Sequence, residues 1–145
     1  MQTFVVDAFT DKPYTGNPAG VCILTGEIPE ALMFKIAAEI NHSETAFILK
    51  HENSFSLRWF TPKAEVSLCG HATLATAHIL YETGLVDKND RIDFSTKSGI
   101  LSARFAHEMI ELDFPQLFVD KCDSNEIIEK AFDIKPIFVG KNEKR

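Results

Sequence analysis

A chain of 145 residues has the length of one ordinary domain and buries about two thirds of its unfolded surface, so its fold requires neither metals nor disulfides. Its hydrophobic content of 45% and its 12 phenylalanines indicate a globular protein and exclude an intrinsically disordered one. The formal net charge of −6 argues against nucleic acids and anionic membranes as partners, because both reward clustered lysine and arginine.

Hydrophobic spacing predicts short strands interrupted by a few helices. The first half of the chain predicts two strands, an amphipathic helix that begins at Pro29, and two more strands, at residues 3–9, 19–24, 29–41, 45–49 and 55–60. A helix follows at residues 72–83, with Gly84 as its left-handed C-terminal residue. The rest of the chain predicts three strands, a helix and a last strand, at residues 91–95, 100–105, 109–114, 124–132 and 136–139.

The helix predicted at residues 72–83 is apolar around most of its circumference. A helix of this kind is buried on most sides, so we expect it to be a central helix inside a sheet. His78 lies on it and is expected to be a core histidine. Because the surrounding strands are short and mostly antiparallel, the predicted class is α+β, with a sheet curled into a barrel around this helix.

The three cysteines are odd in number and widely spaced, which predicts free thiols in a reduced, cytoplasmic setting. No run of about 18 apolar residues occurs, and the first residues lack a basic segment followed by a long apolar one. We therefore expect neither a membrane span nor secretion.

Residues 68–73 read LCGHAT and lie where a strand gives way to the predicted central helix. Helix N-termini present free backbone N–H groups and the positive end of the helix dipole, so this junction is a candidate site for a substrate carboxylate. Gly70 would let the backbone turn and approach a ligand, and His71 would hold a carboxylate or donate to an enolate oxygen. The alternative is that Gly70 only turns the chain and His71 only caps the helix.

Cys69 has two interpretations. A thiol at a helix N-terminus has a lowered pKa and can act as a base or a nucleophile. A buried free cysteine also serves as a small hydrophobic residue, and this structural role is the more frequent one. We expect no metal at Cys69 and His71, because the usual zinc-ligand spacings are absent.

Two polar residues outside the junction are further candidates. Glu44 lies between two segments predicted to enter the core, where desolvation raises the pKa of a carboxyl group and lets it move protons near neutral pH. A solvated loop glutamate is the alternative. Asn17, within Gly16-Asn17-Pro18, would hydrogen-bond a ligand from its loop or simply belong to an ordinary turn.

Five motifs occur in order along the chain: VDAFT at residues 6–10, GNPA at 16–19, SETAF at 43–47, RWFTP at 58–62 and CGHAT at 69–73. Together they resemble the PhzF-like family of phenazine biosynthesis. Residues 109–115, which end in Asp-Phe-Pro, are similar to a strand of the same family. The resemblance covers nearly the whole chain.

The resemblance implies a diaminopimelate-epimerase-like fold, in which two similar halves each curl a sheet around a central helix and the active site lies between them. It implies that residues 1–145 are a single domain corresponding to the first half, with the second half absent. It also implies an isomerase that moves a proton on a small carboxylate-bearing substrate without a cofactor or a metal. The implied assembly is a homodimer or an association with the second half.

The resemblance assigns roles to individual residues. Glu44 matches the catalytic acid/base of the family, and the matching substrate-binding positions are Asn17, Cys69, Gly70, His71, Ala72 and Thr73. Cys69 also aligns with the catalytic thiol of related amino-acid epimerases. Two alternatives stay open: a thiol-based epimerase or racemase, and a non-catalytic module that only folds and dimerises. Because Ala72 stands where the phenazine isomerase has proline, specificity for the phenazine precursor is not implied.

Overall fold

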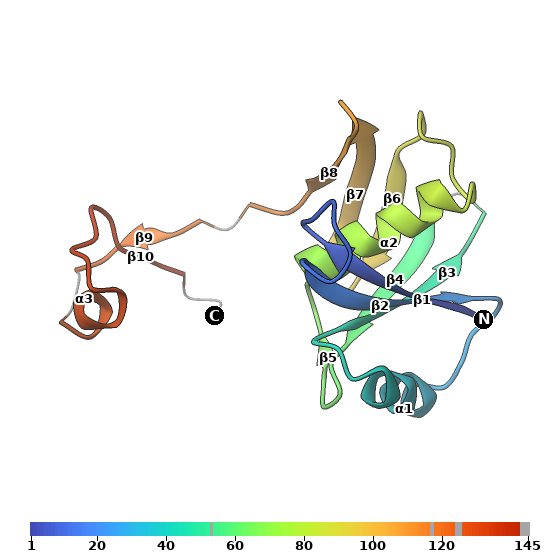
Figure 1. The fold of residues 1–145 in the computed structure, drawn as a ribbon, viewed down its shortest axis with the longest axis horizontal. Coiled ribbons are helices and arrows are strands. Elements are labelled where there is room, and N and C mark those ends of the chain that lie inside the picture. Colours follow the sequence, from blue (N-terminus) through green and yellow to red (C-terminus); the bar gives the residue numbers. More distant parts are fainter. Residues whose placement is uncertain (53, 117, 124–125, 143–145) are drawn as a thin grey trace. The chain divides into compact units, whose positions relative to one another are not determined.

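The computed structural model describes residues 1–52, 54–116, 118–123 and 126–142 (Figure 1). The chain divides into two compact units, Met1–Phe114 and Pro115–Arg145. The described part of the first unit contains one curled sheet and two helices. That of the second unit contains a two-stranded sheet and one short helix.

Eight described strands of the first unit form one sheet in the order β1-β2-β3-β4-β6-β7-β8, with β5 paired to β4. Adjacent strands are antiparallel except for the pairs β2–β3 and β4–β6. The predicted α+β fold with a mostly antiparallel sheet is therefore confirmed. The strands are β1 (Gln2–Ala8), β2 (Asn17–Leu24), β3 (Thr45–Lys50), β4 (Phe55–Phe60), β5 (Glu65–Val66), β6 (Ile92–Thr96), β7 (Gly99–Ala106) and β8 (Met109–Asp113).

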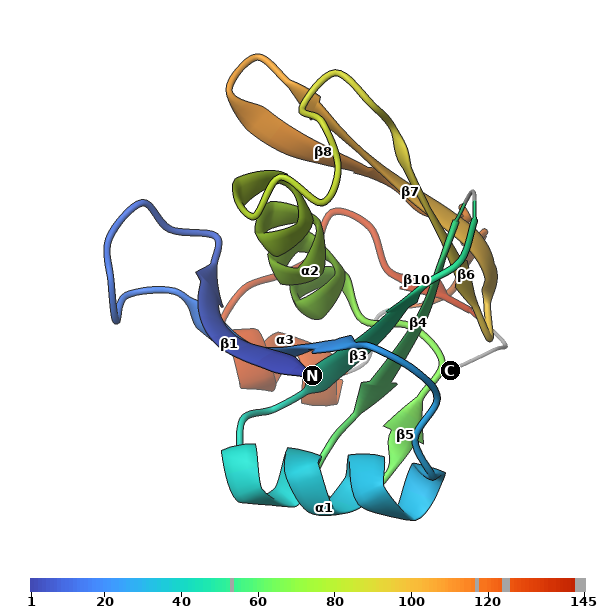
Figure 2. The same cartoon turned by 90° about the vertical axis from the view of Figure 1, so that its right-hand side faces the viewer.

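Both helices of the first unit belong to connections between parallel strands. α1 (Glu30–Ile40) joins β2 to β3, and α2 (Gly70–Glu82) lies between β4 and β6 in the chain. A parallel pair needs such a crossover, because a tight turn would return the chain in the opposite direction. α2 packs inside the curl of the sheet against β1, β2, β3 and β8, whereas α1 packs from outside against β3 and β4 (Figure 2).

Strands β3 and β4 carry apolar side chains on both faces. Ala46 and Ile48 of β3 belong to the core around α2, whereas Phe47 between them packs in a smaller core beneath α1. Residues 45–48 are all buried because both faces of β3 are covered. A strand covered on both faces carries apolar residues in succession rather than at every second position. Phe60 on β4 is fully buried in the smaller core for the same reason.

The central helix was predicted at residues 72–83 and runs from Gly70 to Glu82. Gly84 has the expected positive φ of 69°. The prediction of a core position for His78 is wrong, because His78 is exposed. Leu74, His78 and Glu82 follow one another at every fourth position and line a groove of about 940 Å³ between β1 and β8, the two edges of the curled sheet. The helix is therefore covered on most sides but open along this stripe.

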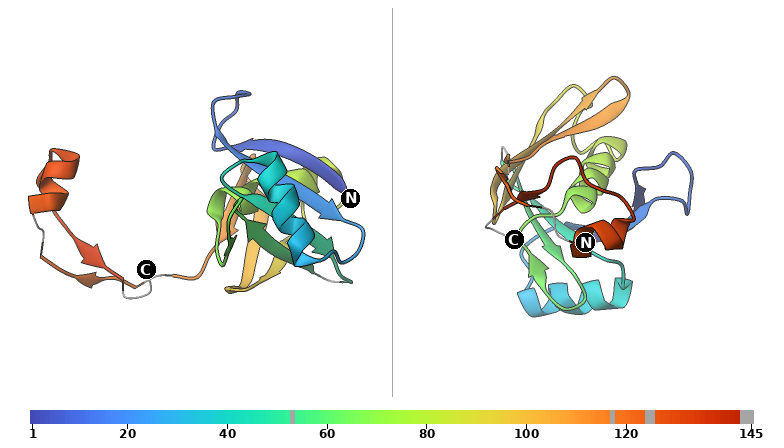
Figure 3. Two further views of the ribbon diagram at one scale, coloured as in Figure 1. Left: turned by 90° about the horizontal axis from the view of Figure 1, so that it is seen from below. Right: turned by 90° about the vertical axis from the view of Figure 1, so that its left-hand side faces the viewer.

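The second unit contains β9 (Asp120–Lys121), α3 (Glu126–Phe132) and β10 (Gly140–Lys141), with β9 and β10 antiparallel (Figure 3). The predicted strand at residues 136–139 is wrong, because pairing with β9 places the strand at Gly140–Lys141. The predicted helix start at residues 124–125 lies outside the described residues. Among the described residues of this unit, seven large apolar side chains are exposed: Phe118, Val119, Ile127, Phe132, Ile134, Ile137 and Phe138.

The longest helix in the described residues, α2, has 13 residues. Among those residues no helix has both the length and the apolar character needed to cross a membrane.

Candidate functional site

The N-terminus of α2 lies beside the start of β3, and this brings Glu44 close to Cys69 and His71. Glu44 immediately precedes β3, and the backbone N–H of Gly20 on β2 donates to its carbonyl oxygen at 3.1 Å. Cys69 is the N-cap residue of α2, and His71 lies in its first turn. Because α2 packs against both β2 and β3, the parallel strand pair and the helix start hold the three residues together.

The imidazole of His71 lies between a thiol and a carboxylate. Its Nδ1 is 3.4 Å from Sγ of Cys69, and its Nε2 is 3.5 Å from Oε2 of Glu44. The exposed fraction is 11% for the side chain of His71 and 21% for that of Glu44. The three groups form a partly buried row, from thiol through imidazole to carboxylate, along which a proton can be passed.

Ser43 is a fourth member of this cluster that the sequence did not single out. Its Oγ lies 3.3 Å from Nε2 of His71. Its only signal in the sequence is its position next to Glu44 in the motif at residues 43–47. A hydroxyl at this place can donate or accept, so it can stabilise either tautomer of His71.

Cys69 does not have the lowered pKa expected for a thiol at a helix N-terminus. Burial raises the pKa of the Cys69 thiol to about 11, the backbone N–H groups of Ala72 and His71 oppose this change, and the Glu44 carboxylate adds to it. Desolvation therefore outweighs the helix terminus, and the expected lowering is wrong. A protonated thiol can donate to Nδ1 of His71, and in that tautomer the N–H of a neutral imidazole is on Nε2, which faces both Ser43 and Glu44.

We expect alkylation of Cys69 by iodoacetamide to be slow at pH 7 and to accelerate with pH, because only the thiolate is nucleophilic. With a pKa of about 11, about one thiol in ten thousand is ionised at pH 7, and this fraction grows about tenfold per pH unit. Peptide mass spectrometry from pH 7 to about pH 10 measures the rate. Alkylation of the half-buried Cys122 in the same sample shows that the reagent is active. A rate at Cys69 that levels off below about pH 8 would contradict this expectation.

The first turn of α2 presents backbone rather than side chains. Ala72 and Thr73 are fully buried, and the Thr73 hydroxyl donates to the carbonyl oxygen of Cys69 at 2.6 Å. Gly70 lies within the helix without a positive φ, so the chain does not need glycine there to turn. A Cβ added to Gly70 would make only an ordinary contact, 3.6 Å from the ring of Phe114. The N–H groups of His71 and Ala72 are directed at the sulfur of Cys69, and the N–H of Thr73 donates to the carbonyl oxygen of Cys69 at 3.3 Å.

Asn17 lies apart from this cluster. It is exposed at the start of β2, where it pairs with Ala8 of β1. Because β2 and β3 are parallel, Asn17 lies at the same end of the sheet as Glu44. Among the described residues no hydrogen bond joins the Asn17 side chain to Glu44, Cys69 or His71.

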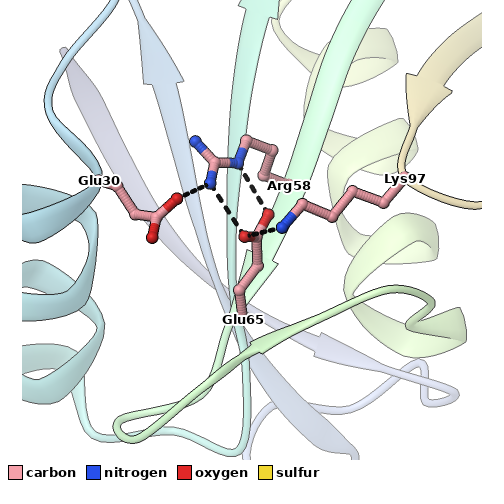
Figure 4. A network of polar contacts seen from close by, with 4 residues as sticks. All are labelled: Glu30, Arg58, Glu65 and Lys97. Atoms are coloured by element: carbon pink, nitrogen blue, oxygen red, sulfur yellow. Dashed lines mark hydrogen bonds and ion pairs between the residues drawn. The ribbon is translucent and has the colours of Figure 1, made fainter.

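A network of charged side chains anchors the strand that leads into α2 (Figure 4). Arg58 on β4 donates to both carboxylate oxygens of Glu65 on β5, at 2.8 and 2.9 Å, and also to Glu30 at the start of α1. Lys97, between β6 and β7, donates to Glu65 as well. The Glu65 side chain is only 9% exposed, and the hydrogen bond from Arg58 lowers its pKa. The network ties β5, which shortly precedes Cys69, to the neighbouring elements.

We expect Glu65→Gln to lower the free energy of unfolding by about 1–3 kcal/mol, because hydrogen bonds to a charged acceptor are lost. The folded state lowers the pKa of Glu65 below its ordinary value of 4.5, so this stability is present above that pH and is lost as pH falls below it. Urea unfolding at pH 7 and at lower pH measures both effects. The control Glu111→Gln breaks an exposed pair with Arg104 and should cost about 0–1 kcal/mol. Equal losses in the two variants at pH 7 would contradict the proposed anchoring.

Comparisons with known proteins agree on one family. The family model described as phenazine biosynthesis-like protein, PhzC-PhzF, matches residues 6–135. An uncharacterized isomerase of Halalkalibacterium halodurans is 49% identical over 141 residues, which cover 96% of this chain and 53% of that protein. The crystal structure of a PhzF-family phenazine biosynthesis protein from Enterococcus faecalis is 41% identical with a TM-score of 0.85, and the match covers 94% of this chain and 52% of that one.

The fold extends to more distant proteins. A predicted epimerase from Pseudomonas aeruginosa, 21% identical, has a TM-score of 0.69 over 91% of this chain and 50% of that one, so the predicted epimerase-like fold is confirmed. This chain spans about half the length of the curated relatives it matches. Because the family model covers most of the sequence and the relatives share nearly half of its residues, the chain belongs to the PhzC-PhzF family of phenazine biosynthesis-like proteins.

Proposed function

We propose that this chain supplies one half of the active site of an isomerase that moves a proton within a small carboxylate-bearing substrate, without a cofactor. The observation that carries the proposal is the partly buried row of Cys69, His71 and Glu44 at the start of α2. Relatives named as isomerases support the general type of reaction. A proton-transfer enzyme needs an acid/base group beside a site that binds the substrate, and the position of Glu44 and His71 beside a helix N-terminus supports this role.

In this proposal Glu44 acts first as the base and then as the acid. Its carboxylate removes a proton from a carbon next to an activating group and returns it to another atom on the same face of the substrate. The positive end of the α2 dipole stabilises the substrate carboxylate placed beside it. The Nε2–H of His71, 3.5 Å from Oε2 of Glu44, holds the charged carboxylate of Glu44 in position and is available to a developing enolate oxygen.

We infer further that residues 1–145 correspond to the N-terminal half of a two-domain isomerase and that the second half completes the cleft. The chain spans about half the length of its relatives. The described part of the unit Pro115–Arg145 exposes seven large apolar side chains, and burying apolar surface contributes about 25 cal/mol per Å². These side chains would pack against the second half or, in its place, against a second copy of the chain.

Isotope exchange with solvent tests the proposal. A chimera that continues this chain with the remaining residues of the Halalkalibacterium halodurans relative supplies a second half. The chimera is incubated in D₂O with a panel of small amino, hydroxy and unsaturated carboxylic acids, and deuterium incorporation is followed by mass spectrometry. We expect exchange next to the carboxylate, or one double bond away, in at least one acid. If a folded chimera incorporates deuterium into none of these acids, the proposed isomerase function is wrong.

A thiol-based epimerase or racemase is the second candidate, favoured by the 3.4 Å distance between Sγ of Cys69 and Nδ1 of His71. In that mechanism His71 accepts the thiol proton, the thiolate is one base, and the second half contributes the opposing one. The pKa of about 11 works against it, because little thiolate exists at neutral pH. The variant Cys69→Ser distinguishes the two mechanisms. The rate of deuterium exchange falls by about 100-fold or more if the thiol is the base, and it persists if Glu44 is the base.

A further inference from the structure

We propose that Glu44, Cys69 and His71 form a binding site for a thiophilic divalent cation, and that zinc is the ion that fits its donors best. Each residue offers one ligand atom, and these three atoms all lie within 4.8 Å of one another. Thiolate sulfur, imidazole nitrogen and carboxylate oxygen are the ligands that zinc takes in proteins. Magnesium and calcium prefer oxygen ligands alone, so this mixed set disfavours them.

The three donors lie within about 1 Å of the spacing that ligand atoms have in a tetrahedral zinc site. Bonds of about 2.0–2.3 Å place the ligand atoms roughly 3.3–3.8 Å apart. Nδ1 of His71 lies 3.4 Å from Sγ of Cys69, and Nε2 lies 3.5 Å from Oε2 of Glu44. One ion binds only one of the two nitrogens, and the three ligand atoms lie within 4.8 Å of one another, so the most widely separated pair must approach by about 1 Å. Glu44 can make this movement, because its side chain is 21% exposed and has several rotatable bonds.

Three protein ligands leave a fourth position around the ion. A fourth position of this kind takes water or another small ligand. Ser43 already lies 3.3 Å from Nε2 of His71 and can hydrogen-bond a water held there. Because the side chains of His71 and Glu44 are partly exposed, an ion can reach the site from solvent while the first unit stays folded.

The site is formed by the tertiary structure rather than by a sequence motif. Cys69 and His71 lie two positions apart at a helix start, and Glu44 comes from the end of a different connection, before β3. Sequence spacing alone therefore gave no reason to expect a metal. Within the part of the chain that the structure describes, no other group of three such side chains comes this close together.

Binding of zinc would block the proposed proton transfer. A zinc-bound thiol is deprotonated, so one proton leaves Cys69 for each ion bound. The Glu44 carboxylate becomes a ligand and can no longer accept a proton from a substrate. The ion would therefore act as an inhibitor, although its binding does not depend on whether the chain is an isomerase.

Metal titration of the untagged 145-residue chain tests the proposal directly. Cobalt is the probe, because a cobalt–thiolate bond produces a charge-transfer band in the near ultraviolet, and zinc is then added in competition. We expect this band on addition of cobalt, its loss on addition of zinc, and release of about one proton per zinc ion at neutral pH. Cys69→Ser should abolish the band, and His71→Ala and Glu44→Gln should each weaken zinc binding by about 100-fold or more, because even the loss of a group that only hydrogen-bonds a metal ligand costs about 10–100-fold.

Cys122→Ser is the matched control, since it removes a half-buried thiol outside the cluster and should leave the band and the affinity unchanged. Protection of wild-type Cys69 from alkylation by zinc at alkaline pH gives a readout that needs no variant. A cobalt complex without the thiolate band, unchanged zinc affinity in a Cys69→Ser variant that keeps the wild-type circular dichroism, or alkylation at the same rate with and without zinc would each overturn the proposal.

Discussion

In the chimera, the variant Glu44→Gln is expected to lower the rate of deuterium incorporation by about 10²–10⁴-fold, the usual contribution of a general acid/base. Glutamine keeps the length of the side chain and can occupy the place of the carboxylate beside Nε2 of His71, but it cannot accept a proton. The loss would therefore fall on the chemical step rather than on folding. The rate is measured in D₂O with the chimera and the best acid of the panel.

Glu39→Gln is the matched control, because Glu39 is an exposed glutamate near the end of α1. It should leave the exchange rate unchanged. If deuterium exchange persists in Glu44→Gln but is abolished in Cys69→Ser, the base is the thiol of Cys69 rather than Glu44. Loss of exchange in both Glu44→Gln and Glu39→Gln would indicate a general effect of charge removal and contradict a specific role for Glu44.

The second large effect is expected at the centre of the first unit, where Leu80→Ala should lower the free energy of unfolding by about 2–5 kcal/mol. Leu80 lies on α2, is fully buried and belongs to the core between this helix and the curled sheet. Its truncation removes apolar contacts and leaves a cavity that close-packed neighbours cannot fill completely. Trp59, the only tryptophan and 1% exposed in the same core, reports unfolding by its fluorescence in urea.

Leu85→Ala is the control for this measurement. It is the same substitution five positions further along, at a residue that is 40% exposed after the end of α2. We expect a change within about 0.5 kcal/mol, as for other surface positions. A similar loss of stability in the two variants would mean that α2 is not the centre of the core.

Sequence patterns predicted the elements of the first unit wherever a pattern extended over several residues. The strand predicted at residues 55–60 has those bounds, and the central helix differs from its prediction by two residues at its start and one at its end. The two-residue strands β5 and β9 were not foreseen, and β10 was placed a few residues too early. Such short strands exist through pairing with a partner, and one or two residues carry no periodicity.

Burial explains the other differences. His78 was expected in the core because its helix is apolar, but the stripe that contains it faces the opening between β1 and β8. The helix start predicted a lowered pKa for Cys69, whereas desolvation raises it. The exposure of His78 and the raised pKa of Cys69 both depend on which parts of the fold cover the residue. The neighbouring residues in the sequence do not determine this coverage.

The sequence by itself determined the order of the main elements, the α+β class, the family and the residue types near the start of α2, because periodicity and motifs are local properties of the chain. Only the tertiary structure decided that the imidazole of His71 lies between Cys69 and Glu44 and that Ser43 joins them. The packing of α2 against β2 and β3 sets these distances. The physical reason is that proton transfer and metal binding depend on separations of a few ångströms between groups far apart in sequence, and packing alone establishes those separations.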